Sequence, residues 1–273
     1  MELDKNLTFA VTHGRTGTTF VTKLFSLFED THSEHEPEPN FAKEFPQVKQ
    51  DPREAVEFWK VKLDAISKIP QKNYVETSNV FGKGYFIPLL RAFDIYPNLI
   101  LLAREFRDIA KSLYKRGSIP ARSQNGKLFS CHPEQPGALP IFKHDQLTDY
   151  QMCYWAVLDA FMRQLQAEGI YASKGLNNFA WVSANSLHEF EILKNCGELF
   201  GLKFADEEDA KKQHAEMIQK TFNANPEREV EPVEDIDKQE AIVIDRIAYY
   251  NMTFAETLLQ TDFVDPHTLK KFA

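Results

Sequence analysis

The sequence predicts an α/β fold in which a central parallel sheet is flanked by helices, giving three layers. Three observations carry this prediction. Strand and helix signals alternate along the 273 residues, the apolar strand segments are short, and the first of them leads into a Gly- and Thr-rich loop followed by a helical apolar pattern. With 43% hydrophobic and 12% aromatic residues, the chain can build a large core and is not of the disordered class.

The elements follow in order from these patterns. Apolar and β-branched runs predict strands near residues 7–13, 74–77, 98–103 and 179–184. Helical spacing of apolar residues predicts helices near residues 17–28, 51–68, 84–95, 105–116, 148–168, 186–200, 207–220 and 236–261. The helix at 51–68 has a defined start, with Asp51 as N-cap, Pro52 at the first helical position and Glu54 after it. Because ligands of parallel sheets bind outside the carboxyl ends of strands, residues 13–15, 76–79 and 104 are expected at one edge.

The loop after the first strand has the composition of an anion-binding site. Free backbone N–H groups and the positive end of the helix dipole point into such a loop. Its backbone and side-chain donors come from Gly14, Arg15, Thr16, Gly17, Thr18 and Thr19. The loop is not a Walker A sequence, because its two glycines are only three positions apart and Thr follows the second one where that motif needs Lys. A tight connection without a ligand is the alternative interpretation.

Three segments resemble sulfotransferases that use 3′-phosphoadenosine 5′-phosphosulfate (PAPS). Residues 15–19, Arg-Thr-Gly-Thr-Thr, are similar to the family's 5′-phosphosulfate loop, Lys/Arg-x-Gly-Thr/Ser-Thr. Arg104 ends a strand pattern and Ser112 follows eight positions later, as do the family's Arg and Ser that hold the 3′-phosphate, although Glu-Phe replaces the usual Asp/Asn-Pro after the Arg. Residues 181–202 resemble the family's later strand and its helix ending in Phe-Leu-Gly-Leu.

The resemblance covers residues 7–202 and carries further expectations. It implies a P-loop-like fold with about four to five parallel strands. It also implies a single sulfotransferase domain over 1–273, with a PAPS-binding core at about 7–202 and a C-terminal helical part at about 203–273. PAPS would be the donor and 3′,5′-adenosine bisphosphate (PAP) the product. Arg15 would stabilise charge on the departing phosphate.

Two carboxylates, Glu36 and Glu38, are the candidates for a general base. The alternating prolines around them favour an extended backbone, in which residues two apart point the same way, so both are expected to face the cleft. Neighbouring carboxylates disfavour each other's charge, which suits a base. In family members with a Glu base, that residue follows the loop's basic residue by some twenty positions. Glu36 lies 21 positions after Arg15 and is the leading candidate, with two solvated Glu as the alternative.

Other titratable residues have weaker claims. His13 and His35 are alternative bases, and Glu76 is expected to orient the substrate or Arg15. Many cytosolic family members carry Lys-Thr-His near this point, and the Glu-Thr-Ser found here argues against a His base in that position. Phe222 is a candidate for stacking on the adenine. No metal is expected, because a sulfuryl group carries less negative charge than a phosphoryl group and no metal-ligand pattern is recognisable.

The charge distribution favours a small ligand over a polymer. The net charge of −8 argues against nucleic acid as a partner. Between residues 104 and 127, however, the sequence has seven basic residues and only two acidic ones, which fits the binding of one small polyanion. The Pro-rich segment 117–146 lacks periodicity and is expected to be a substrate-facing lid, with a disordered insertion as the alternative. Its basic residues, which could meet an acidic or hydroxylated acceptor, are Arg122, Lys127, His132, Lys143 and His144.

The remaining features indicate a cytoplasmic protein. The first residues are polar and no apolar run is long enough to span a bilayer, so neither a secretory signal nor a transmembrane segment is expected. Cys131, Cys153 and Cys196 are odd in number, widely spaced and without a CxxC motif, which is typical of reduced thiols. The oligomeric state stays open.

The patterns together favour transfer of a sulfuryl group from PAPS to a hydroxyl of a carbohydrate, glycolipid or small metabolite. The alternatives are an ATP-dependent small-molecule kinase of P-loop type and a catalytically inactive nucleotide-binding protein. The kinase is disfavoured because the loop lacks the Lys-Ser/Thr pair of Walker A and the strand at 98–103 leads into Arg instead of a Mg²⁺-binding Asp.

Overall fold

The described residues form an α/β fold around a five-stranded, all-parallel sheet, as the sequence predicts. The computed structural model describes residues 3–220 and 229–272. The strand order is β2-β3-β1-β4-β5, and every neighbouring pair is parallel. The strands are β1 (Asn6–Val11), β2 (Thr31–His35), β3 (Asn73–Thr77), β4 (Asn98–Ala103) and β5 (Phe179–Ser183). Strands β1 and β4 lie inside the sheet.

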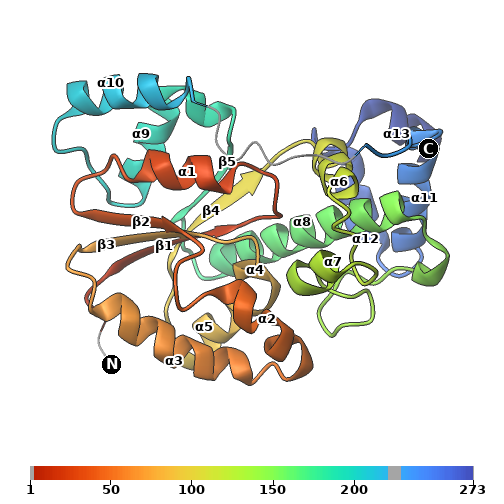
Figure 1. Ribbon diagram of the computed structural model, residues 1–273, viewed down its shortest axis with the longest axis horizontal. Helices are drawn as coiled ribbons and strands as arrows, with labels where there is room; N and C mark the ends of the chain where they lie inside the picture. The colour runs from red at the N-terminus through yellow and green to blue at the C-terminus, as the bar shows by residue number, and fades with distance from the viewer. Residues whose placement is uncertain (1–2, 221–228, 273) are drawn as a thin grey trace. The chain divides into compact units, whose positions relative to one another are not determined.

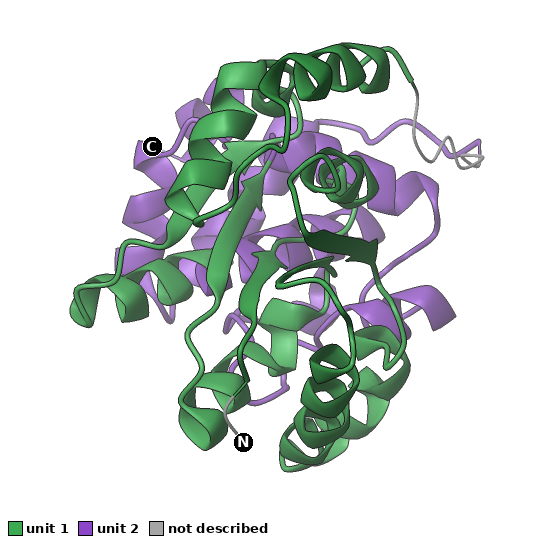
Figure 2. Ribbon diagram, turned by 90° about the vertical axis from the view of Figure 1, so that its left-hand side faces the viewer, with its two compact units in different colours: residues 1–103, 164–224 green, residues 104–163, 225–273 purple. Residues whose placement is uncertain are grey.

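The chain divides into two compact units, residues 1–103 with 164–224 and residues 104–163 with 225–273 (Figure 2). The first unit contains the sheet, with helices on both faces (Figure 1). One face carries α1 (Thr18–Phe25), α9 (Phe190–Leu199) and α10 (Glu207–Met217), and the other carries α2 (Phe41–Gln50), α3 (Glu54–Ser67), α4 (Phe81–Gly84) and α5 (Phe86–Phe93). This unit therefore has three layers.

The second unit is helical. It contains α6 (Phe106–Lys115), α7 (Gln124–Phe129), the 3₁₀ turn η1 (His144–Gln146), α11 (Ile236–Ala248), α12 (Met252–Gln260) and α13 (Pro266–Phe272). Helix α8 (Asp149–Ser173) runs from this unit into the first, which also holds the 3₁₀ turn η2 (Ser186–His188). Among the described residues, no helix combines the length and the apolarity that crossing a bilayer demands.

Alternate residues of β1 fill the cores on the two faces of the sheet. Phe9 stacks on Phe81 of α4 with ring centroids 4.7 Å apart and meets Trp59 of α3 edge to face. The neighbouring Ala10 belongs to the cluster on the opposite face, with residues of α1 and α9 such as Leu24 and Leu193. Both faces are therefore buried, and truncating a ring such as Phe9 to Ala costs about 3–5 kcal/mol.

Several predicted boundaries need correction. The edge strand β2 was not predicted, because Thr-His-Ser-Glu-His has no apolar alternation. The predicted helix 236–261 is two helices, because the Asn251 side chain accepts the backbone N–H of Phe254 and starts α12. Helix α3 begins at Glu54, later than predicted, because Asp51 accepts the N–H of Arg53 in a turn before the helix. Helix α7 and the turn η1 lie within the segment that was expected to be irregular.

Candidate active site

The loop between β1 and α1 lies at the carboxyl edge of the sheet and has a backbone that exposes the start of α1. Arg15 and Gly17 both have left-handed backbone conformations, with φ of 76° and 95°. Gly17 is the N-cap of α1 and, as a glycine, offers the helix no side-chain cap. A Cβ at Gly17 would come within 2.7 Å of the Ala184 Cβ, so the position requires glycine. The N–H groups at the start of a helix are suited to an anion.

Hydroxyl groups hold the loop from inside. The Thr16 hydroxyl lies 2.7 Å from the Thr12 hydroxyl and donates to the His13 carbonyl at 2.9 Å. Thr12 in turn donates to the carbonyl of Leu102 on β4. Thr16 is buried and its hydroxyl is hydrogen-bonded within the loop, where it was expected to be a donor to the ligand. Any contribution of Thr16 to anion binding comes from its backbone.

The two candidate carboxylates diverge, contrary to the expectation from the prolines. Glu36 has a φ of 52°, which breaks the extended run, and its carbonyl accepts the side-chain amide of Asn40 at 2.6 Å. Its carboxylate turns towards the end of β3, whereas the exposed Glu38 pairs with the exposed Lys43. Glu36 and Glu38 therefore do not face one point.

Asn79 lies between the loop and Glu36. Its side-chain amide donates to Oε1 of Glu36 at 3.1 Å, and the Ser78 hydroxyl lies 3.5 Å from the same oxygen. Gly14 also adjoins Asn79, because a Cβ at Gly14 would lie 3.6 Å from the Asn79 Cγ. The buried Lys83 of α4 donates to the side-chain oxygen of Asn79 at 3.3 Å. The structure thus brings the predicted anion loop and the leading base candidate together around one amide.

Glu76 is fully buried and does not orient Arg15 as expected. Its Oε2 lies 2.7 Å from Nζ of Lys62 and accepts the Tyr74 hydroxyl at 2.5 Å. Burial raises the pKa of the Glu76 carboxyl to about 7, against the opposing attraction of Lys62. Lys62 also donates to the Pro39 carbonyl at 2.7 Å. This buried pair therefore anchors the segment that carries Glu36 to the sheet.

His13 and His35 make similar hydrogen bonds through Nδ1 but differ in burial. Nδ1 of the buried His13 lies 3.0 Å from the Gly14 carbonyl oxygen. Nδ1 of His35 lies 2.7 Å from the Thr77 carbonyl, so the neutral ring donates there and keeps its lone pair on Nε2. The same holds for His13, but His35 is only partly buried and is therefore the more accessible alternative base.

Arg104 and Ser112, the predicted 3′-phosphate ligands, belong to the second unit. Arg104 directly follows β4, is half exposed and pairs with Asp108 at 2.9 Å. Ser112 lies in α6 and is partly buried. The predicted basic stripe is reduced by structural ion pairs, because Arg107 is held by carboxylates including the buried Glu240.

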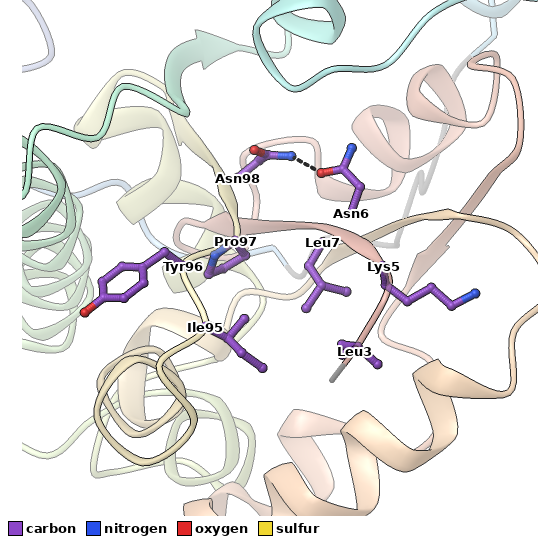
Figure 3. A pocket seen from close by; sticks show the side chains of 8 residues that line it. All are labelled: Leu3, Lys5, Asn6, Leu7, Ile95, Tyr96, Pro97 and Asn98. Carbon is purple, nitrogen blue, oxygen red and sulfur yellow. Dashed lines mark hydrogen bonds between the residues drawn. The ribbon is translucent and has the colours of Figure 1, made fainter. Parts of the chain in front are cut away.

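A pocket at the opposite edge of the sheet does not coincide with these residues. It has a volume of about 180 Å³ and is formed by the amino ends of β1 and β4, where the Asn98 amide donates to Asn6 at 2.9 Å (Figure 3). Lys5 at its rim donates to the carbonyls of Ile69 and Gln71. Because parallel sheets bind ligands at the carboxyl ends of their strands, we do not assign the reaction to this pocket.

Comparison of the sequence with protein-family models and with curated proteins found no match. Function is therefore inferred from the residues themselves. The resemblance to sulfotransferases rests on three short motifs, and the structure adds the contacts around them. Phe222, the candidate for adenine stacking, lies outside the described residues.

Sequence reasoning missed three polar residues that support the site. Lys62 lies on the apolar face of α3 together with Trp59 and Ile66. A charged residue among apolar residues at helical spacing is the feature of the sequence that could have indicated a buried, partnered lysine. The buried Gln164 of α8 donates to the Val11 and Leu102 carbonyls at 2.8 and 2.9 Å, linking the ends of β1 and β4. Lys83 carries no comparable signal, because α4 is a single short turn.

Proposed function

We propose that the protein is a PAPS-dependent sulfotransferase that acts on a hydroxyl of a carbohydrate, a glycolipid or a small metabolite. The observation that carries this proposal is the amide of Asn79, which adjoins Gly14 of the anion loop and donates to the carboxylate of Glu36. Sulfuryl transfer needs a binding site for the anionic donor directly beside a base that deprotonates the acceptor. The two features meet within one unit of the fold.

Each residue has a role in this proposal. The N–H groups at the start of α1 and the side chain of Arg15 bind the phosphosulfate and stabilise the charge that develops on the departing phosphate oxygen. Glu36 accepts the proton of the acceptor hydroxyl as its oxygen bonds to sulfur and the bond from sulfur to the phosphate oxygen breaks. Asn79 orients Glu36. The family resemblance assigns Arg104 and Ser112 to the 3′-phosphate of PAPS, with PAP as the product.

The test is group transfer from a labelled donor. PAPS with a labelled sulfuryl group is incubated with the protein and with pools of monosaccharides, glycolipids and small alcohols or phenols, without added Mg²⁺. We expect label in at least one pool and none with the Glu36→Gln variant. Transfer of labelled phosphate from ATP with Mg²⁺, with none from PAPS, would replace the proposal by the kinase. Transfer from neither donor, together with no nucleotide binding, would overturn both.

A further inference from the structure

Two imidazoles and one carboxylate converge in the second unit, inside the segment 117–146. The ligand atoms of His132, Glu134 and His144 all lie within 4.8 Å of one another. One carboxylate oxygen of Glu134 is 3.7 Å from Nε2 of His144, and the other is 4.0 Å from Nδ1 of His132. The two rings stand edge to face with centroids 5.6 Å apart. We propose that these three residues bind a divalent transition-metal ion, with zinc as the leading candidate.

The chemistry of the three side chains fits this class of ion. Two His nitrogens and one Glu oxygen are a common zinc ligand set that leaves a coordination position open, whereas Mg²⁺ and Ca²⁺ prefer oxygen ligands. The backbone N–H of Glu134 donates to Nδ1 of His132 at 3.1 Å, so this nitrogen has its lone pair, and coordination there replaces the hydrogen bond from Glu134. The side chains of His132 and Glu134 are 45% and 72% exposed, which leaves them room to close to the ~2.0–2.2 Å bonds of zinc.

Hydrogen bonds to α8 and α11 hold the backbone between Glu134 and His144. The buried Leu139, midway along this stretch, donates its N–H to Asp159 of α8 at 2.8 Å and accepts the Trp155 indole N–H at 3.0 Å. On the His144 side, Arg246 of α11 donates to the Lys143 carbonyl at 2.7 Å. A site held in place before binding costs less ordering entropy when the ion arrives.

The spacing explains why the sequence did not indicate this site. Glu134 and His144 are separated by nine residues that contain two prolines, and the ligands match no recognised zinc motif. The fold brings them together, with contacts to α8 at Leu139 and to α11 at Lys143 holding the stretch between them. A bound ion would cross-link residues 132 and 144 and stabilise the segment expected to face the acceptor.

The experiment is a zinc titration of the untagged, reduced chain at pH 7.5 in competition with a chromophoric zinc indicator. We expect one Zn²⁺ per chain with a dissociation constant in the micromolar range or tighter. His132→Ala and His144→Ala should each weaken binding at least about tenfold, because each removes one of three ligands. His267→Ala removes an exposed imidazole elsewhere in the same unit and is the matched control.

The fold of each variant is checked by its thermal unfolding midpoint without metal, which should equal that of the wild type because the cluster is largely exposed. The proposal is overturned if the wild type binds no stoichiometric zinc, or if both His variants bind it as tightly as the His267→Ala control. Tighter binding of Mg²⁺ or Ca²⁺ than of Zn²⁺ would contradict the assignment to the transition metals.

Discussion

Asn79 donates its side-chain amide to the carboxylate of Glu36 at 3.1 Å and also adjoins Gly14. Both contacts follow from the sheet order, because β3 pairs with β2, which precedes Glu36, and with β1, which precedes Gly14. The loop that is suited to bind an anion and the carboxylate that is suited to accept a proton thus both contact the side-chain amide of Asn79. The predictions below test the roles of these groups and of the residues that hold them.

Replacing the proposed base should stop turnover without weakening donor binding. Glu36→Gln keeps the size of the side chain but cannot accept a proton, so the rate should fall by roughly 10²–10⁴-fold. The dissociation constant for PAP should change less than about twofold, because the carboxylate is assigned to the acceptor. Both are measured by label transfer and calorimetric titration.

Glu38→Gln is the control for that experiment, because Glu38 pairs with Lys43 at the surface. We expect near-normal turnover from this variant. If Glu38→Gln is inactive and Glu36→Gln is active, the base has been assigned to the wrong carboxylate. If both variants stay active, His35 is the next residue to test.

Arg104→Ala should weaken binding of PAP but not of adenosine 5′-phosphosulfate, which lacks the 3′-phosphate. A charge-assisted contact is worth about 1.5–3 kcal/mol, which corresponds to a loss of roughly 10- to 150-fold. Lys111→Ala removes an exposed charge from α6 and should have little effect. Equal losses for both nucleotides in Arg104→Ala would mean that Arg104 does not hold the 3′-phosphate.

Gly17→Ala should lower the free energy of unfolding by more than the strain of its left-handed backbone alone accounts for. Gly17 and Gly201 both have left-handed φ values, and an Ala costs about 1–2 kcal/mol in either position. A Cβ at Gly17 also meets Ala184 at 2.7 Å, whereas none of the described atoms lies within 4 Å of a Cβ at Gly201. Urea unfolding should therefore show a larger loss for Gly17→Ala, by about 1–3 kcal/mol, and PAP affinity should fall in that variant alone. Equal losses would contradict the close approach.

Lys62→Met should destabilise the protein in a pH-dependent way. The pKa of Glu76 is raised from 4.5 to about 7 on folding, so its contribution to stability falls as the pH rises from about 4.5 to 7. Removing Lys62 takes away the attraction that favours the carboxylate, and this raises the pKa of Glu76 further. Above pH 7 the wild type forms the buried charged pair, whereas the Glu76 carboxyl of the variant stays protonated and the attraction to Lys62 is lost. At pH 5 Glu76 is protonated with or without Lys62.

Urea unfolding at pH 5 and pH 8 tests this expectation. The loss at pH 8 should exceed the loss at pH 5 by up to about 1.4 kcal/mol, because one pH unit separates pH 8 from the wild-type Glu76 pKa of about 7. Lys60→Met, on the exposed side of the same helix, should show no such dependence. A loss in Lys62→Met that is equal at the two pH values would mean that Lys62 does not act through Glu76.

The fold could be predicted further than the site, because its signals are local. Every residue of β4 is buried, so its apolar run indicated an inner strand, whereas the polar β2 at the sheet edge carried no such signal. The anion loop could also be predicted, since its donors are consecutive. The contact of Asn79 with Glu36 joins residues 43 positions apart and depends on the left-handed backbone at Glu36, which overrides the extended preference of the prolines.

The most direct test of the proposed function is a thermal unfolding comparison of the protein with PAP, with ATP and Mg²⁺, and with buffer alone. At a PAP concentration near 100 times its dissociation constant, we expect about 2.7 kcal/mol of stabilisation, or a rise of roughly 5–10 °C in the unfolding midpoint, without any need for Mg²⁺. Arg15→Ala should reduce that rise. A midpoint that is raised by ATP with Mg²⁺ as much as or more than by PAP, or by neither nucleotide, would contradict the assignment to PAPS chemistry.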